Sequence, residues 1–462
     1  MHSKSAPQNV VVGRRLGAIG FVIAAAIVGC SGSGTGVSTP GIPNGPQTVL
    51  AEKEIRHVVI VVQENRTFDN LFATYPGADG ATVGTLHNGK HFKLIKGTLV
   101  SKELNHMHSG FVTEYDGGKM DGFDKIGYGS SGTGGPAGKY PLRYVNPAQI
   151  RPYWAMAKNY ALADHMFQTQ GSGSFTAHQD LIAAGTAIDS TESLIDSPSQ
   201  GPWGCDAPTP GPKNTPPGTV TSLITSSGQY LFNKGPFPCL RYATLKDLLD
   251  PKGLSWKYYV PPLLTRGSSG FLWNAFDAIR NVRYGPDWAS NDVSPETTIF
   301  KDITANRLAA VSWVIPCGTN SDHAAGTDNG PSWVAGVVNA IGKSPAWKST
   351  VIIVVWDDWG GYYDNVAPPQ LDYQGLGFRV PMLVVSPYAK SVGYISHTQY
   401  EFGSILKFVE GNWGLGSLGA TDARATSIAD MFDFSKSPRA FVPIQAEPWK
   451  ACSHGDAAPD DE

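Results

Sequence analysis

The chain has 462 residues, of which 41% are hydrophobic and 16% are charged, and its formal net charge is −3 at pH 7. Without an overall excess of basic residues it offers no general positive field for DNA or RNA, so nucleic-acid binding is not expected. Beyond the N-terminal leader no second linker divides the chain, which predicts one large core with long loop insertions.

The first 50 residues are not expected to belong to the folded domain. Three basic residues precede an apolar stretch that ends in IVGC at Cys30 and resembles a bacterial lipobox, which predicts a lipoprotein-type signal peptide over residues 1–29. A plain signal peptide with an incidental cysteine is the alternative. Residues 30–50 are rich in Gly, Ser and Pro and predict a flexible tether. We therefore expect export, either to the cell envelope (outer membrane or periplasm) as a lipoprotein held in the membrane through a lipidated Cys30, or as a secreted protein.

Two apolar runs each end on a pair of metal-ligand-type side chains. HVVIVVQ is followed by Glu64-Asn65, and TVIIVVW is followed by Asp357-Asp358. Their consecutive β-branched residues predict strands buried on both faces of a parallel sheet. Ligands of such sheets bind beyond the carboxyl ends of the strands, so these oxygen-bearing side chains could converge on one hard cation. The alternative is that they only mark where the chain reaches water. Because the arrangement occurs twice, we favour the metal site.

Further runs indicate the layers around this sheet. Residues 307–316 and 378–388 predict two more strands. Between them, residues 331–347 predict an amphipathic helix with Ser332 as its cap and Gly342 as its stop. Strand, helix and strand in this order form a crossover unit, which favours an α/β/α sandwich with a mostly parallel central sheet.

The remaining segments complete this outline. A second helix is predicted over residues 402–413, with Gly411 near its end. Residues 115–145 and 200–240 lack periodicity and predict long loops that shape access to the site. The folded domain is expected to span residues 51–445, followed by a solvated C-terminal tail over 446–462.

Cysteine usage is consistent with an exported protein. If Cys30 is lipidated, four cysteines remain, and an even number in an exported chain predicts disulfides in one of three pairings. Cys205 and Cys239 flank an irregular excursion that a disulfide would help to order, so we predict this bond and, with it, Cys317–Cys452.

Histidines supply the candidate acid–base groups. His323 follows a predicted strand and has Ser321 and Asp322 beside it, which makes it the best candidate for a general acid. We interpret His178 and His397 as structural.

Several motifs together carry a family resemblance. They are QENRTFDNLF, GGKMDGF, SDH, TVIIVVWDDWGGYYDNVAPP and HTQYEFGSILKFVE, and they span nearly all of residues 55–415 in the expected order. In these the chain resembles the bacterial phosphoesterase family of phospholipases C and related acid phosphatases. The resemblance implies an alkaline-phosphatase-like α/β/α fold and metal-dependent hydrolysis of phosphoric esters through a covalent phospho-enzyme.

The resemblance also implies roles for particular residues. The metal ligands of the family fall on Glu64-Asn65, on Asp357-Asp358 and on the nucleophile, which matches Ser174 in GSGSFTAHQ. Thr176 is the alternative nucleophile, because phospholipase-type members have Pro-Asn after the nucleophile and this chain does not. That departure slightly favours phosphomonoesters over a phospholipid headgroup as the substrate.

The chemistry of these residue types agrees with the implied reaction. A divalent cation such as Mg, Ca, Mn or Zn can activate a serine hydroxyl and polarise a phosphoryl oxygen. His106, His108 and His323 could hydrogen-bond phosphate oxygens or protonate the leaving group, with His323 as the acid and His106 as a phosphate contact. A non-catalytic cell-surface binding protein on the same fold is the alternative function.

Overall fold

The computed structural model describes residues 54–263, 269–324 and 326–452. The predicted signal peptide, the tether up to residue 50 and the last ten residues of the predicted tail lie outside the described residues.

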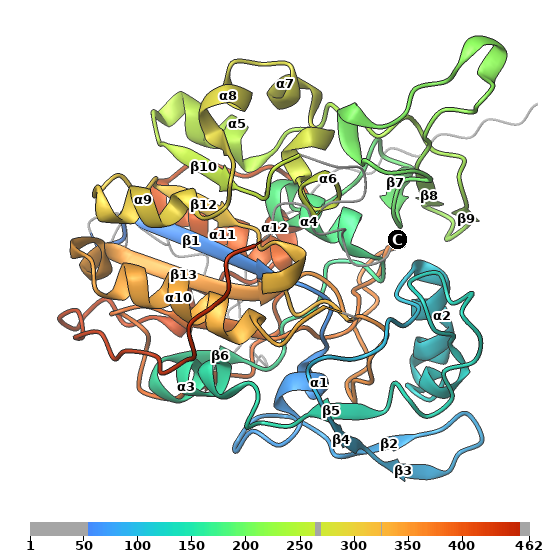
Figure 1. The fold of residues 1–462 in the computed structure, drawn as a ribbon, viewed down its shortest axis with the longest axis horizontal. Helices are drawn as coiled ribbons and strands as arrows, with labels where there is room; N and C mark the ends of the chain where they lie inside the picture. The colour runs from blue at the N-terminus through green and yellow to red at the C-terminus, as the bar shows by residue number, and fades with distance from the viewer. Residues whose placement is uncertain (1–53, 264–268, 325, 453–462) are drawn as a thin grey trace, which may run out of the picture. The chain divides into compact units, whose positions relative to one another are not determined.

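An eight-stranded sheet forms the centre of the molecule (Figure 1). In spatial order its strands are β11 (Asp292–Val293), β10 (Trp256–Tyr259), β12 (Val311–Val314), β1 (His57–Gln63), β13 (Thr350–Trp356), β14 (Met382–Val385), β6 (Ala161–Ala163) and β15 (Tyr394–Ser396). Every neighbouring pair is parallel except the two that involve β14, which runs antiparallel to both β13 and β6. The predicted mostly parallel sheet is therefore confirmed.

The two β-branched runs form the central strands β1 and β13. In both, every residue is buried except the partly exposed His57. Burying one Val or Ile side chain contributes about 1.5–3 kcal/mol, so these runs are stable only with helices on both faces. The predicted strands at 307–316 and 378–388 are present as the shorter β12 and β14.

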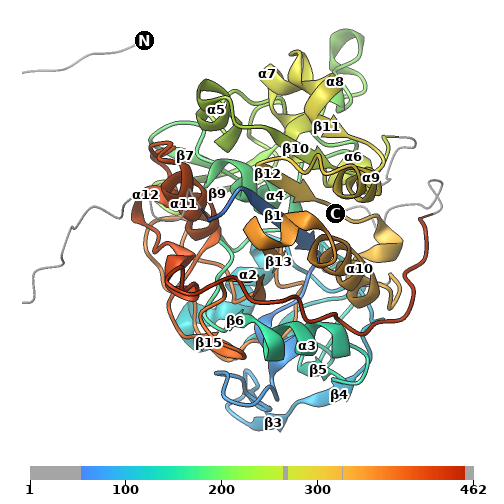
Figure 2. The same ribbon diagram turned by 90° about the vertical axis from the view of Figure 1, so that its left-hand side faces the viewer.

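Helices cover both faces of this sheet. Figure 2 shows α3 and α10 on one side and α11 on the other, and α4 packs against α11. The helices are α1 (Phe68–Phe72), α2 (His108–Tyr115), α3 (Arg151–Asn159), α4 (Ser174–Ala183), α5 (Leu245–Leu249), α6 (Ser269–Leu272), α7 (Arg280–Arg283), α8 (Asp287–Asn291), α9 (Thr298–Thr304), α10 (Gly330–Gly342), α11 (Phe402–Trp413) and α12 (Thr421–Arg424). This arrangement is the predicted α/β/α sandwich.

The predicted helix boundaries need one correction. Helix α10 ends at Gly342 as expected, but it begins at Gly330 after Asn329, so Ser332 lies inside the helix and is not its cap. Pro331 occupies the first turn, where its missing N–H costs no hydrogen bond and its fixed φ favours the helix. Helix α11 is confirmed and ends before Gly414, which adopts a left-handed conformation.

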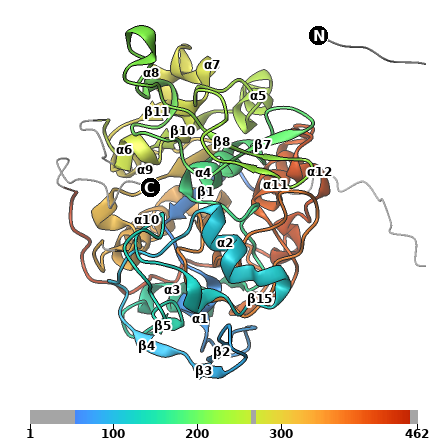
Figure 3. The same cartoon turned by 90° about the vertical axis from the view of Figure 1, so that its right-hand side faces the viewer.

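Short strands outside the main sheet build the insertions. β2 (Val83–Thr85) pairs with β3 (His91–Lys93), β4 (Ile95–Gly97) pairs with β5 (Arg143–Val145), and β7 (Glu192–Ile195), β8 (Ser222–Thr225) and β9 (Tyr230–Leu231) form a third sheet. Figure 3 shows β7 and β8 near α4, and α2 below them. None of the helices in the described ranges has the length and hydrophobicity that a membrane span requires.

Both predicted disulfides, Cys205–Cys239 and Cys317–Cys452, are present. The second joins the loop after β12 to the C-terminal segment, where Trp449 also packs against Phe300 and Trp333. Trp449 and Cys452, in the first part of the predicted tail, are therefore held against the domain, although the tail residues between and before them are exposed.

Candidate active site

The two strand-ending pairs meet at one edge of the sheet. β1 and β13 are parallel neighbours in which Gln63 lies opposite Trp356, so the residues that follow leave the sheet side by side. The Asn65 backbone N–H donates to Asp357 Oδ1 at 3.0 Å, and Asn65 Nδ2 donates to Asp358 Oδ2 at 3.2 Å. Glu64 and these three residues are fully buried.

Unusual backbone conformations bring the pairs together. Asn65 has a φ of +54°, a left-handed conformation that Asn tolerates better than most residues. Gly360 has a φ of +61°, and a Cβ at this position would lie 2.3 Å from the Asn65 carbonyl oxygen. The Gly360 N–H donates to Asp358 Oδ1 at 2.7 Å. Glycine is thus required here both for its conformation and for the close approach of the two turns.

Ser174 completes the cluster from the opposite side. It is the first residue of α4, after Gly173, and its side chain is fully buried. Its Oγ donates to Asp358 Oδ2 at 3.1 Å and to Glu64 Oε2 at 3.3 Å. Thr176, by contrast, directs its hydroxyl to Ser172 Oγ at 2.6 Å and to the Gly173 carbonyl at 3.1 Å. The geometry therefore favours Ser174 over Thr176 as the reactive hydroxyl.

His178 also lies in this cluster, contrary to its interpretation as structural. Its Nε2 is 2.9 Å from Glu64 Oε1 and 3.7 Å from Asp357 Oδ2. A helix that starts at Ser174 places residue 178 one turn later on the same face, so the spacing of four residues could have identified it.

His106 approaches Asn65 from another loop, and His323 lies beside His106 with the ring centroids 6.2 Å apart. Their Nδ1 atoms lie 3.3 Å and 3.2 Å from the two carboxylate oxygens of Glu103, which sequence reasoning overlooked. The Nε2 of His106 is 3.1 Å from Asn65 Nδ2. Glu103 stands three residues before His106, a spacing that is a weak signal outside a helix. The Glu103 carboxylate thus lies on the Nδ1 side of both the His106 and the His323 ring.

The loop that carries His323 is held by the buried Asp322. The Asp322 carboxylate accepts hydrogen bonds from the Tyr153 hydroxyl at 2.7 Å and from Trp356 Nε1 at 3.0 Å, and its backbone carbonyl accepts from Arg66 Nε at 2.9 Å. Burial raises the pKa of Asp322 to about 6, although the charge of Arg66 opposes this shift. This network fixes where the neighbouring imidazole lies.

His108 and His397 are placed differently. His108 Nδ1 is 2.8 Å from the Gly171 carbonyl oxygen, and its ring lies beside Tyr230 of β9 with the centroids 5.5 Å apart. His108 therefore lies near the cluster, and the loop before α4 connects the two. His397 interacts with Asp164 at 2.8 Å, and its side chain is 60% exposed, which agrees with the structural interpretation.

The donor atoms of the cluster fit a divalent cation. Among the described residues, one group whose ligand atoms lie within 4.8 Å of one another is Glu64, His178 and Asp357, and all three are buried. Two further buried atoms, Asn65 Oδ1 and Asp357 Oδ2, accept no hydrogen bond. Buried carboxylates that lie this close repel one another unless a positive charge or a proton is present. A bound cation would give Asn65 Oδ1 and Asp357 Oδ2 a partner, and its positive charge would offset the repulsion between the carboxylates.

Comparison with known proteins relates the sequence of this chain to a family. The sequence model of the Phosphoesterase family matches residues 55–416. Phospholipase C A of Mycobacterium tuberculosis is 24% identical over 459 residues, covering 86% of this chain and 80% of the relative. Non-hemolytic phospholipase C of Pseudomonas aeruginosa is 23% identical over 450 residues, covering 83% of this chain and 58% of the relative. A solved protein in the alkaline phosphatase superfamily from Vibrio parahaemolyticus aligns over 82% of this chain and 72% of its own, with 12% identity and a TM-score of 0.37.

Proposed function

Because this chain belongs to the Phosphoesterase family and is a phosphoric ester hydrolase, we propose that Ser174 is its nucleophile and that a divalent cation assists it. The observation that carries the proposal is the position of Ser174 Oγ, which lies within hydrogen-bond distance of both Glu64 and Asp358. The Ser174 hydroxyl is thus held between carboxylates contributed by two different strand ends.

The residues proposed to hold the cation are Glu64, Asn65, Asp357 and Asp358, together with the Ser174 hydroxyl. Carboxylate and amide oxygens suit Mg, Ca or Mn, and the adjacent His178 nitrogen keeps Zn among the candidates. When bound, such a cation supplies Lewis acidity, which lowers the pKa of a nearby hydroxyl and offsets negative charge on a phosphoryl group.

The phosphoryl group is transferred in two steps, first to Ser174 and then to water. In the first, the Ser174 oxygen forms a bond to phosphorus, its proton moves to the adjacent carboxylate of Asp358, and the bond from phosphorus to the ester oxygen breaks. His323, which enters this step protonated at both ring nitrogens, donates its Nε2 proton to the leaving oxygen, and His106 contacts the phosphoryl group. In the second step water attacks the phosphorus and gives a proton to His323, the bond from phosphorus to the Ser174 oxygen breaks, and Asp358 returns its proton to Ser174 as phosphate or a phosphomonoester leaves. The N-terminal end of α4, where Ser174 lies, favours an anion.

The orientation of the two histidines supports these roles. Glu103 and backbone carbonyl oxygens lie on the Nδ1 side of both rings, so Nδ1 stays protonated and Nε2 is the nitrogen that exchanges a proton with the substrate. General acid catalysis of this kind contributes about 10² to 10⁴ in rate.

The substrate class is proposed from the relatives, which are named phospholipases C, and from the sequence after the nucleophile, which lacks Pro-Asn. We propose phosphoric esters of either the phospholipid headgroup or the phosphomonoester type. The test is a parallel assay of an aryl monophosphate, an aryl phosphodiester and phosphatidylcholine with Mg, Ca, Mn or Zn added. Preferential turnover identifies the class, whereas no hydrolysis of any of the three would contradict the proposed function.

A further inference from the structure

Charge is distributed very unevenly in this nearly neutral chain. Residues 80–102 and 139–163 contain no Asp or Glu, and each segment carries four Lys or Arg residues. These eight are Lys90, Lys93, Lys96, Lys102, Lys139, Arg143, Arg151 and Lys158. The net charge of −3 therefore conceals a strongly basic region that the overall composition could not reveal.

The two segments are neighbours in space. β4 of the first segment pairs in parallel with β5 of the second, with Ile95 opposite Arg143. Figures 1, 2 and 3 all show β3, β4, β5 and α3 gathered at the same end of the domain. We call the outer surface of residues 80–102 and 139–158 the basic face.

The cations of the basic face are available to a partner. Seven of the eight are exposed and Arg143 is partly exposed. Among the described residues none of the eight lies within ion-pair distance of a carboxylate. The neighbouring Asp124 and Asp79 are engaged by His87 and His165 instead. Arg151 also lines an adjoining cavity, whose lining includes the carboxylates of Asp328 and Glu447.

Apolar side chains lie among these charges. Val83, Ile95 and Val100 are 49%, 42% and 45% exposed, which is unusual for large aliphatic residues. Two of them lie on the short strands β2 and β4, and the third follows β4.

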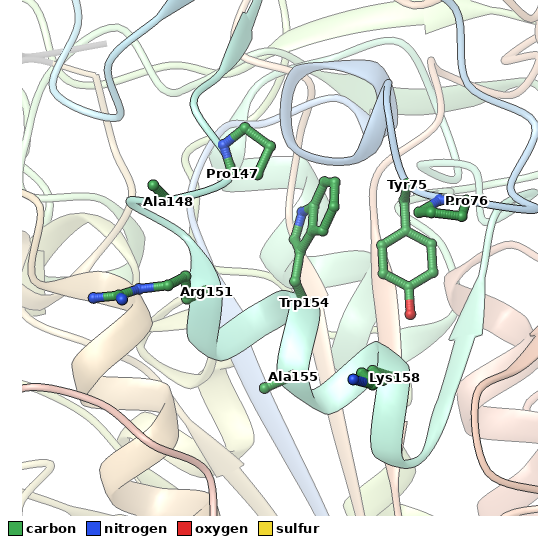
Figure 4. A pocket seen from close by; sticks show the side chains of 8 residues that line it. All are labelled: Tyr75, Pro76, Pro147, Ala148, Arg151, Trp154, Ala155 and Lys158. Atoms are coloured by element: carbon green, nitrogen blue, oxygen red, sulfur yellow. The ribbon is translucent and has the colours of Figure 1, made fainter.

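An aromatic pocket of about 590 Å³ opens at the α3 side of the basic face (Figure 4). The rings of Trp154 and Tyr75 lie side by side in it with their centroids 5.0 Å apart, and Arg151 and Lys158 belong to its lining. Because Trp154 Nε1 already donates to the Leu71 carbonyl at 3.1 Å, its indole presents only apolar surface to a ligand.

We infer that the basic face docks on an anionic phospholipid bilayer. Clustered Lys and Arg attract acidic headgroups, and aliphatic and aromatic side chains among them enter the interfacial layer, a combination that neither a free phosphate nor a nucleic acid backbone would require. The choice of a phospholipid partner rests on the proposed function, but docking itself needs no turnover. Phe92 of β3 and Tyr144 of β5 pack against the buried cluster that contains Trp359 and Tyr363, so the docked layer adjoins the turn that carries Asp358.

The electrostatic part is tested by vesicle co-sedimentation. The Ser174→Ala variant provides a background without turnover. Vesicles of phosphatidylcholine alone are compared with an equal mixture of phosphatidylcholine and phosphatidylglycerol. We expect binding only to the mixture, weakened at least about tenfold by Lys96→Glu with Lys158→Glu and by added salt. The matched control, Lys252→Glu with Lys301→Glu, makes the same charge change on exposed lysines elsewhere and should retain binding.

The apolar part is tested at high salt, where the remaining binding should fall several-fold in Ile95→Ser. The control Val392→Ser alters a side chain that is 68% exposed outside the basic face. Equal binding by the Lys96/Lys158 variant and its control would overturn the inference. Stronger binding to duplex DNA than to the mixed vesicles would overturn it in favour of a nucleic acid partner. Every protein in these binding assays carries Ser174→Ala and has no turnover. A loss of docking is therefore measured separately from a loss of catalysis.

Discussion

Ser174 and Asp358 are 184 positions apart in the chain, yet Ser174 Oγ lies 3.1 Å from Asp358 Oδ2. The contact joins the start of a buried helix to the turn after the central strand β13. It converts two separate local patterns, a serine in a glycine-rich turn and an acidic pair after a strand, into one candidate site. The experiments below test the parts of that site separately.

Removal of a proposed metal ligand should remove metal and activity together. We expect Asp357→Asn and Glu64→Gln to lower turnover at least about 100-fold, because several kcal/mol of transition-state stabilisation depend on the cation. Elemental analysis should show less bound metal in both variants. The control Asp116→Asn changes an exposed carboxylate outside the cluster that pairs with Lys119, and it should behave as wild type. Full activity after exhaustive chelation would contradict the metal-dependent account.

Replacement of His178 should impair catalysis, although the sequence led us to interpret this residue as structural. Its Nε2 lies 2.9 Å from Glu64 Oε1, so His178→Ala leaves that carboxylate without its positioning partner. Losses of about 10- to 100-fold in activity or metal affinity are typical for such partners. His397→Ala removes an exposed imidazole outside the cluster and should leave both quantities unchanged. If the two variants are equally active, His178 is structural after all.

Stability should fall as pH rises from about 4.5 to about 8 because of Glu410 on α11. Burial, followed by repulsion from Asp422, raises the pKa of Glu410 to about 8. The folded protein therefore holds this proton more tightly than the unfolded chain. The resulting stabilisation is fully present below the unfolded pKa, about 4.5, and is lost as pH rises through about 8. In urea unfolding between pH 5 and pH 9, Glu410→Gln should lose less stability than wild type. Parallel pH profiles for the two proteins would show that the shift is absent.

The sequence was most informative where local pattern and burial coincide. The β-branched runs of β1 and β13 must be buried on both faces, and this fixed the position of Glu64-Asn65 and Asp357-Asp358 at one sheet edge. The disulfide Cys205–Cys239 was predictable because the segment between these two cysteines is irregular. A cross-link lowers the conformational entropy that is lost when such a segment becomes ordered.

Features that depend on tertiary contacts escaped prediction. The strand β6 is only three residues long, Ala161–Ala163, and carries no distinctive strand pattern of its own. The packing of Trp449 on Trp333 joins segments that are far apart in the chain, so residues near the C-terminus looked like a solvated tail. Glu103 has no helical or strand periodicity that would relate it to His323.

The central claim is that Ser174 is the nucleophile, and the most direct measurement is the intact mass of the protein quenched in acid during turnover of an aryl phosphate. We expect one added phosphoryl group, mapped by peptide sequencing to Ser174. It should accumulate further in a His323→Ala variant, because an aryl leaving group departs without an acid whereas the attacking water then lacks the base that accepts its proton. Ser174→Ala should show neither the added mass nor turnover, whereas Thr176→Val should retain both. Full turnover by Ser174→Ala, or a phosphoryl group mapped to Thr176, would contradict the account.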